Sequence, residues 1–197
     1  ENGLITRFGD WVIRAALAEA RRLPNHVKVS VNISPLQIHS SNLMTTIVNA
    51  IAANKIDPRR LELEITETVL TSDTNFTLKR LHKLKEIGVG IALDDFGTGY
   101  SSLSYLRSFP FDKIKIDKSF VRDMAVDEGD TTIVRAIIQL GKSLGMLVIA
   151  EGVETPDEGK ALRDLGISLM QGYLFSKPLF ETCSHAASLA WPSEAAS

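Results

Sequence analysis

The chain contains 197 residues, of which 44% are hydrophobic and 23% are charged, and its formal net charge is −2. This composition is typical of a globular domain with a substantial core, and it excludes a disordered or fibrous protein. The charge balance gives no general attraction to nucleic acid or acidic lipid, the single cysteine (Cys183) excludes an internal disulfide, and no apolar run approaches the roughly 18 residues of a membrane span.

Helix-like and strand-like segments alternate along the whole chain. In some segments apolar residues recur at helical spacing, and in others, such as VKVSVNIS, they alternate with polar residues. In chain order we expect a helix over 8–23, a strand over 27–34, a helix through 43–51, a strand over 61–67, a helix through 78–84, strands over 90–95 and 112–117, a helix through 133–144 and a strand over 146–152. Thr155, Pro156 and Glu158 then form a helix start, and residues 169–175 supply the last strand.

This alternation predicts an α/β fold with a parallel sheet, because strands begin about every 22 to 34 residues, the spacing of βα units. With about six strands, two architectures stay open at this point. A closed (β/α)₈ barrel of the TIM type needs eight strands, whereas an open doubly wound sheet tolerates six. No glycine-rich dinucleotide fingerprint follows an early strand, so the open sheet would lack its usual function.

Five of the expected strands carry a polar side chain near their carboxyl end, on the face opposite their apolar residues. These side chains are Asn32, Glu64, Asp94 with its neighbour Asp95, Lys115 and Glu151. One acid at a strand end is more often a cap or a solvated rim residue than part of a site. Five together favour a site, because barrel active sites lie at the carboxyl ends of the strands.

The chemistry of this set indicates a metal-dependent phosphoester hydrolase. Oxygen donors without histidine or cysteine favour Mg²⁺ or Mn²⁺ over zinc, and two ions about 3.5–4 Å apart suit in-line attack on phosphorus. Asp94 can bridge two ions while Asp95 serves one of them. Lys115 can stabilise the charge of the transition state, and Glu151 can accept the proton of the attacking water.

Ordered motifs across nearly the whole chain resemble the EAL-domain family, the phosphodiesterases of the bacterial second messenger cyclic di-GMP. These motifs are VNISPLQ, LELEITET, DDFGTGYSSLSYLRSFPFDKIKIDKSFV, AEGVET and QGYLFSKP. The resemblance implies a (β/α)₈ barrel of the TIM type. It also implies hydrolysis of cyclic di-GMP to linear pGpG with two Mg²⁺ or Mn²⁺ ions.

The resemblance also implies roles for individual residues. Metal ligands are expected at Asn32, Glu64, Asp94, Asp95 and Glu151, and the catalytic residues are expected to be Glu151, Lys115 and Asp95. Glu154, Gln171 and Pro178 are expected to bind or orient the substrate and the water. Glu67 matches a glutamate that holds the loop over residues 96–106, which in the family couples dimerisation to metal and substrate binding.

The family's Glu-Ala-Leu motif belongs to a strand upstream of ENGLI, so we expect the barrel to lack its first strands here. The EAL domain is expected over residues 1–180, with a C-terminal helix or tail over 181–197. The resemblance further implies a cytoplasmic homodimer with an upstream GGDEF or sensory domain, in a protein that can be membrane-anchored. No DNA, RNA or membrane contact is expected of this domain. Two alternatives stay open: a catalytically silent cyclic di-GMP receptor and a dimerisation scaffold.

Overall fold

A computed structural model describes residues 2–71, 74–98, 103–109, 111–122, 124 and 128–178 of the chain. The expected C-terminal helix or tail over 181–197, Cys183, and residues 99–102 of the loop after the aspartate pair therefore lie outside the described residues. The chain divides into two compact units, residues 1–114 and residues 115–197. Among the described residues, no helix is both long enough and apolar enough to cross a membrane.

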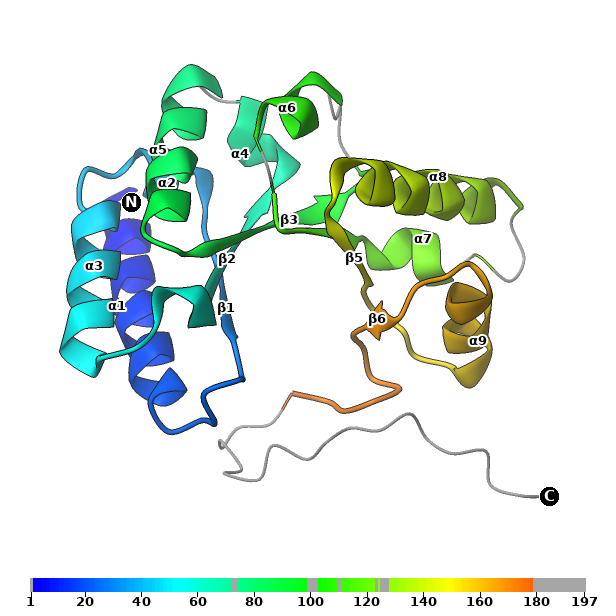
Figure 1. Cartoon of the computed structure of the whole chain (residues 1–197), viewed down its shortest axis with the longest axis horizontal. Coiled ribbons are helices and arrows are strands. Elements are labelled where there is room, and N and C mark those ends of the chain that lie inside the picture. Colours follow the sequence, from blue (N-terminus) through cyan, green and yellow to red (C-terminus); the bar gives the residue numbers. More distant parts are fainter. Residues whose placement is uncertain are drawn as a thin grey trace. The chain divides into compact units, whose positions relative to one another are not determined.

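The first unit alternates helices with parallel strands (Figure 1). Its elements are α1 (Asn2–Ala20), β1 (Val29–Asn32), α2 (Pro35–His39), α3 (Leu43–Asn54), the 3₁₀ turn η1 (Pro58–Arg60), β2 (Leu61–Thr66), α4 (Glu67–Thr71), α5 (Thr74–Glu86), β3 (Gly90–Phe96), α6 (Leu103–Ser108) and the start of β4 (Lys113–Ile116). Within this unit, α1 packs against α3 and β1, and α5 packs against β3.

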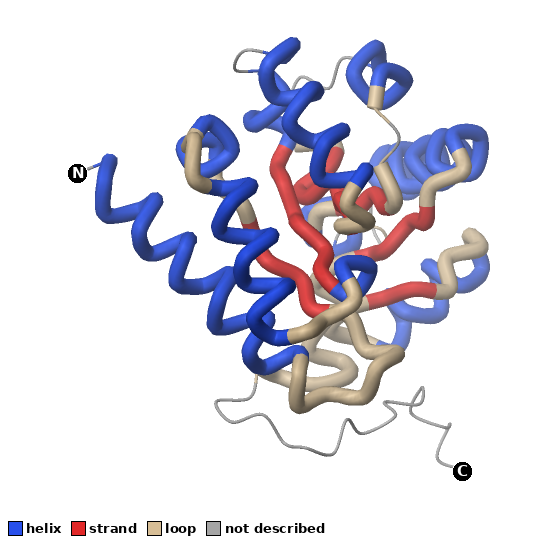
Figure 2. The backbone as a smooth tube through the Cα atoms, turned by 60° about the vertical axis from the view of Figure 1, so that its left-hand side comes forward, coloured by secondary structure: helices blue, strands red, loops and turns tan. Residues whose placement is uncertain are grey.

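The strands of the first unit pair in chain order. Val29 of β1 pairs with Leu61 of β2, and Ile65 of β2 pairs with Leu93 of β3, in both cases in parallel. β4 starts beside β3, since the Asp112 amide donates to the Ile91 carbonyl at 2.9 Å. Figure 2 shows these strands, in red, with helices alongside them. The order confirms the predicted βα repeat.

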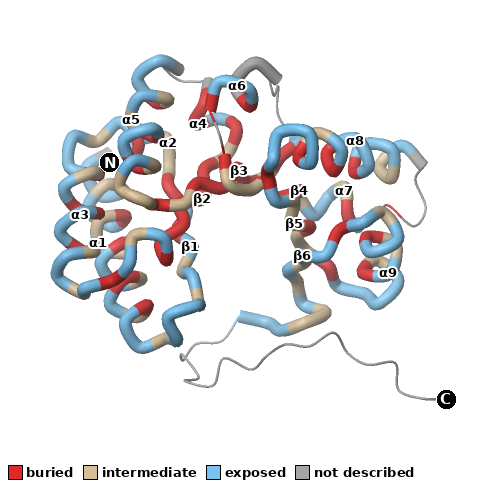
Figure 3. Tube along the Cα trace, in the orientation of Figure 1, coloured by how far each residue is buried: buried red, intermediate tan, exposed pale blue. Residues whose placement is uncertain are grey.

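The core of the first unit lies between its strands and helices. Figure 3 shows β2 and β3 as mostly buried. On β2, Leu61, Leu63 and Ile65 are fully buried. Ile13 and Leu17 of α1 are also fully buried. This burial stabilises the unit by removing apolar surface from water, at about 25 cal/mol per Å².

The second unit repeats the same pattern. It contains the end of β4, α7 (Lys118–Arg122), α8 (Glu128–Leu144), β5 (Leu147–Ala150), α9 (Pro156–Asp164) and β6 (Leu169–Met170). The Glu151 amide, directly after β5, donates to the Ile116 carbonyl at the end of β4 at 3.2 Å, so the carboxyl ends of β4 and β5 lie side by side. β5 pairs in parallel with β6 through Ile149 and Leu169.

Most predicted elements are confirmed, with differences at the ends of two of them. The capping box at Thr155 and Glu158 is present as predicted. The first helix occupies residues 2–20 in place of 8–23. Buried Arg60 donates to the carbonyls of Ala20 (2.7 Å) and Leu23 (3.2 Å), which satisfies the end of α1 before Pro24. β6 has only two residues in place of the predicted seven.

The short helices α2, α4, α6 and α7 were not predicted, because five or six residues are too few to show a helical period.

Candidate active site

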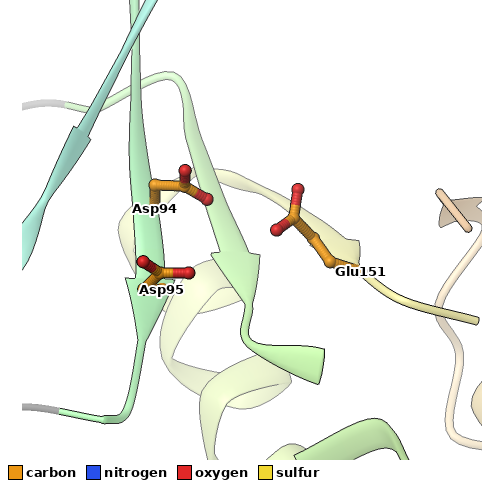
Figure 4. A group of neighbouring side chains, drawn as sticks. All are labelled: Asp94, Asp95 and Glu151. Atoms are coloured by element: carbon orange, nitrogen blue, oxygen red, sulfur yellow. The ribbon is translucent and has the colours of Figure 1, made fainter. Parts of the chain in front are cut away.

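Asp94 and Asp95 stand at the end of β3 and direct their carboxylates to the same side of the strand (Figure 4). Neighbouring side chains on a strand normally point to opposite faces. Asp95 breaks this alternation because its φ is 53°, in the left-handed region. One carboxylate oxygen from each residue therefore lies within 4.8 Å of the other. Aspartate tolerates this conformation better than most residues, so the pair can share a cation.

A tight turn follows the aspartate pair. The Thr98 hydroxyl donates to the Asp95 carbonyl at 2.9 Å, and Gly97 has a φ of 103°, which favours glycine. Buried Glu67, at the start of α4, accepts a hydrogen bond from the Gly97 amide at 2.9 Å. Glu67 thus contacts the loop that the resemblance assigns to it.

Glu64 and Asn32 lie on neighbouring strands of the same unit. The register pairs Asn32 with Glu64, and it pairs Thr66 with Asp94. Since residues two apart on a strand share a face, Asn32, Glu64 and Asp94 share one face of the sheet. Glu64 and Asp94 are 9% and 7% exposed, whereas Asn32 is exposed.

This group of side chains fits a hard divalent cation. Its donors are carboxylate and amide oxygens, which Mg²⁺ and Mn²⁺ prefer. Two buried carboxylates on one face repel each other unless a cation neutralises them. The described residues of the first unit therefore carry the predicted ligands Asn32, Glu64, Asp94 and Asp95 on adjacent strands.

In the second unit, buried Lys115 forms an ion pair with half-buried Glu151. The Lys115 Nζ lies 2.7 Å from Glu151 Oε1, and the two side chains are 5% and 17% exposed. Lys115 comes from β4, and Glu151, which Figure 4 labels, directly follows β5. The ammonium group orients the Glu151 carboxylate, and it places a fixed positive charge beside a potential proton acceptor.

The remaining predicted residues of the second unit follow β5 and β6. Glu154 is exposed, and its amide donates to Glu158 of the α9 capping box at 2.7 Å. Gln171 and Pro178 both line a cavity of about 660 Å³. The backbones of these two segments touch, since a Cβ on Gly172 would lie 2.1 Å from the Val153 carbonyl oxygen.

Sequence reasoning missed a second ion pair, formed by Glu62 of β2 and Lys113 of β4 in the first unit. Glu62 lies two residues before Glu64, and its side chain is 3% exposed. It accepts from Lys113 at 2.8 Å and from Ser30 at 3.4 Å. The signal in the sequence was the same alternation that identified Glu64, because Glu62 has the same parity on β2.

Comparison with known proteins identifies the family. The family model of the EAL domain matches residues 1–178. The chain belongs to the EAL-domain family. A cyclic di-GMP phosphodiesterase of Pseudomonas aeruginosa, NbdA, is 40% identical over 182 residues, which cover 90% of this chain and 23% of NbdA. The chain spans from 22% to 31% of the length of the curated relatives it matches.

Solved EAL structures confirm the predicted α/β fold of the TIM type. The PaMucR phosphodiesterase in complex with c-di-GMP is 39% identical with a TM-score of 0.86, over 90% of this chain and 73% of that one. BlrP1 of Klebsiella pneumoniae, in a manganese and c-di-GMP complex, is 35% identical with a TM-score of 0.82, over 88% and 44% of the two chains. A calcium and c-di-GMP complex of BlrP1 also matches. EAL domains therefore include members that bind divalent metal and c-di-GMP.

Proposed function

We propose that this EAL domain is a metal-dependent phosphodiesterase that hydrolyses cyclic di-GMP to linear pGpG. The observation that carries the proposal is the pair Asp94 and Asp95, whose carboxylates face the same side because Asp95 is left-handed. Such a pair would help to hold the divalent metal of the reaction. The c-di-GMP phosphodiesterase names of NbdA and PaMucR support the substrate.

We assign the metal to Asn32, Glu64, Asp94 and Asp95 of the first unit, together with Glu151 of the second. All five supply the hard oxygen donors that Mg²⁺ and Mn²⁺ prefer. When bound, Mg²⁺ or Mn²⁺ supplies electrophilic activation of the phosphodiester and neutralises its charge.

The chain's own residues supply the proton chemistry and the positioning. The Glu151 carboxylate accepts a proton from water during attack, and Lys115, 2.7 Å away, holds that carboxylate in place and offsets negative charge on the phosphorus oxygens. Glu154, Gln171 and Pro178 orient the substrate and the water. The cavity that Gln171 and Pro178 line also contains Tyr173, whose ring offers a stacking surface for a base.

The proposal extends to partners and compartment. One relative, MucR, is named a bifunctional diguanylate cyclase and phosphodiesterase. We propose that this domain likewise works beside a GGDEF or sensory domain, as a homodimer and in the cytoplasm, with residues 1–180 as the EAL domain and 181–197 as a helix or tail. Glu67 transmits dimerisation to the site through the Gly97 loop.

Turnover of cyclic di-GMP by the full-length protein tests the proposal. The purified protein is incubated with cyclic di-GMP and Mn²⁺, and the products are separated by chromatography. Accumulation of pGpG is the expected result, and it should stop when a chelator removes the metal. Tight binding without product contradicts the proposal and supports the alternative, a catalytically silent receptor. The predicted ligands that the sequence retains favour the enzyme.

A further inference from the structure

Helix α2, which follows Asn32, contains a buried glutamine side chain. Gln37, in α2, is 5% exposed. Among the residues that the structure describes, its Nε2 atom has no hydrogen-bond partner. A buried amide donor without a partner costs about 1–3 kcal/mol, so a glutamine at this position requires an explanation.

The orientation of this side chain is fixed by a capping box at the start of α2. The Ser34 amide donates to Gln37 Oε1 at 3.1 Å, and the Ser34 hydroxyl donates to the same atom at 2.9 Å. In return, the Gln37 amide donates to Ser34 Oγ at 3.3 Å. Because Oε1 must face the Ser34 donors, Nε2 must face away from them.

The Nε2 atom is directed at the backbone of α1. A Cβ on Gly9 would lie 1.8 Å from Gln37 Nε2 and 2.3 Å from its Cδ. Glycine within a helix costs about 1 kcal/mol relative to alanine, yet any larger residue at this place would have to displace the Gln37 amide. Gly9 is buried, so α1 and the glutamine amide pack in direct contact.

This contact bears on the site because α2 follows β1, the strand that Asn32 ends, after only Ile33 and Ser34. Asn32 ends β1 and is exposed. On one side, its strand pairs with β2. After it come only Ile33, whose amide donates to the Glu64 carbonyl at 2.8 Å, and then Ser34 of the capping box. The backbone that carries the Asn32 side chain is therefore held at its carboxyl end by the box.

We infer that Gln37 is a positioning residue for Asn32, acting through the Ser34 capping box and requiring glycine at position 9. The inference rests on the proposed function, in which Asn32 binds metal. Residues that orient a metal ligand typically change metal affinity by about 10–100-fold when they are removed.

The test measures Mn²⁺ affinity by calorimetry and the melting temperature of the full-length protein for each variant. Gln37→Ala removes the box and Ser34→Ala removes its hydroxyl contacts, and each is expected to weaken Mn²⁺ binding by about 10-fold. Ser34→Ala is the milder change, since the loss of an N-cap costs about 1 kcal/mol, so it keeps the test informative if Gln37→Ala does not fold. Unchanged affinity in both variants overturns the inference.

Gly9→Ala separates positioning from stability. Its methyl group displaces the glutamine, so both the melting temperature and the Mn²⁺ affinity should fall. In the double variant Gly9→Ala with Gln37→Ala the clash is absent, so the melting temperature should recover while the Mn²⁺ affinity stays low. Gly3→Ala, in the same helix with nothing within 4 Å, is the matched control: it should leave the Mn²⁺ affinity unchanged and should not lower the melting temperature. Affinity that recovers with the melting temperature contradicts the inference.

A second readout distinguishes this inference from the proposed function. The side-chain amide signal of Asn32 in an NMR spectrum, assigned with Asn32→Asp, should shift or broaden in Gln37→Ala and Ser34→Ala and stay in place in Gly3→Ala. If the unaltered protein binds no Mn²⁺, the proposed function fails, and this signal still decides the role of Gln37. A signal that stays in place in the box variants overturns that role.

Discussion

Asp94 and Asp95 are sequence neighbours on one strand, yet their carboxylate oxygens lie within 4.8 Å of each other because the Asp95 backbone is left-handed. The conformation and the charge of Asp95 can be separated by substitution. Asp95→Asn keeps a residue that tolerates this backbone and removes the charge. Mn²⁺ affinity should fall by about 10–100-fold, which is the loss seen when a residue that only orients a metal ligand is removed. The melting temperature should stay the same.

Asp95→Val is the matched conformational variant, because a β-branched residue is strained at positive φ by about 1–2 kcal/mol. It should lower both Mn²⁺ affinity and the melting temperature. Equal melting temperatures in the two variants would contradict the strained backbone at this position.

Glu151 is expected to accept the proton of the attacking water, so Glu151→Gln should reduce turnover of cyclic di-GMP by about 10²-fold or more. Substrate binding should be largely retained, since the glutamine is of equal size. Steady-state kinetics with Mn²⁺ gives both values. Glu19→Gln is the matched control, because it makes the same substitution at a glutamate of α1 that pairs with Arg22 and lies outside the proposed site. Near-normal activity in Glu151→Gln would remove Glu151 from the mechanism.

The hydrogen bond from the Gly97 amide to Glu67 should protect that amide from exchange with solvent. A hydrogen bond to a charged group contributes about 1.5–3 kcal/mol. Glu67→Ala should therefore speed hydrogen exchange of the Gly97 amide by at least about 10-fold. Glu67→Gln keeps an acceptor oxygen and should have a smaller effect. Identical exchange in all three proteins would show that the bond does not hold the loop.

Glu62 is buried and its partner Lys113 is half-buried, so removing Lys113 leaves an uncompensated buried charge. Lys113→Met should lower the free energy of unfolding by about 3–5 kcal/mol. Glu62→Met with Lys113→Met should recover most of that loss, because two apolar side chains can replace a buried ion pair. Chemical denaturation measures both. If the double variant is as unstable as Lys113→Met, the loss of stability comes from packing and not from the unpaired charge of Glu62.

Asp57 provides a prediction about pH. The side chain and the backbone amide of Arg59 both donate to its carboxylate, and they lower the pKa of Asp57 from 3.8 to about 2. Because the folded pKa lies below the unfolded one, this pair stabilises the fold above about pH 4. The stabilisation is lost as the pH falls through about 2. An NMR titration should show the low pKa of Asp57, and Arg59→Ala should raise it.

The sequence by itself placed the polar residues on their strands. Asn32, Glu64 and Asp94 were assigned from a period of two residues, and the register confirms that they share a face. The α9 start was equally predictable, because Thr155 and Glu158 bond to each other's backbone within four residues. Such features depend on contacts between near neighbours, which a sequence displays directly.

Only the tertiary structure decided the contacts between distant segments. Strand alternation alone would point the Asp95 side chain away from that of Asp94. The left-handed backbone at Asp95 turns it to the same side. The end of α1 depends on Arg60, forty residues beyond Ala20. The contact between Gly9 and Gln37 joins a helix to a later turn. In each case one side chain meets a backbone that is remote in sequence, so no local pattern of residues could reveal it.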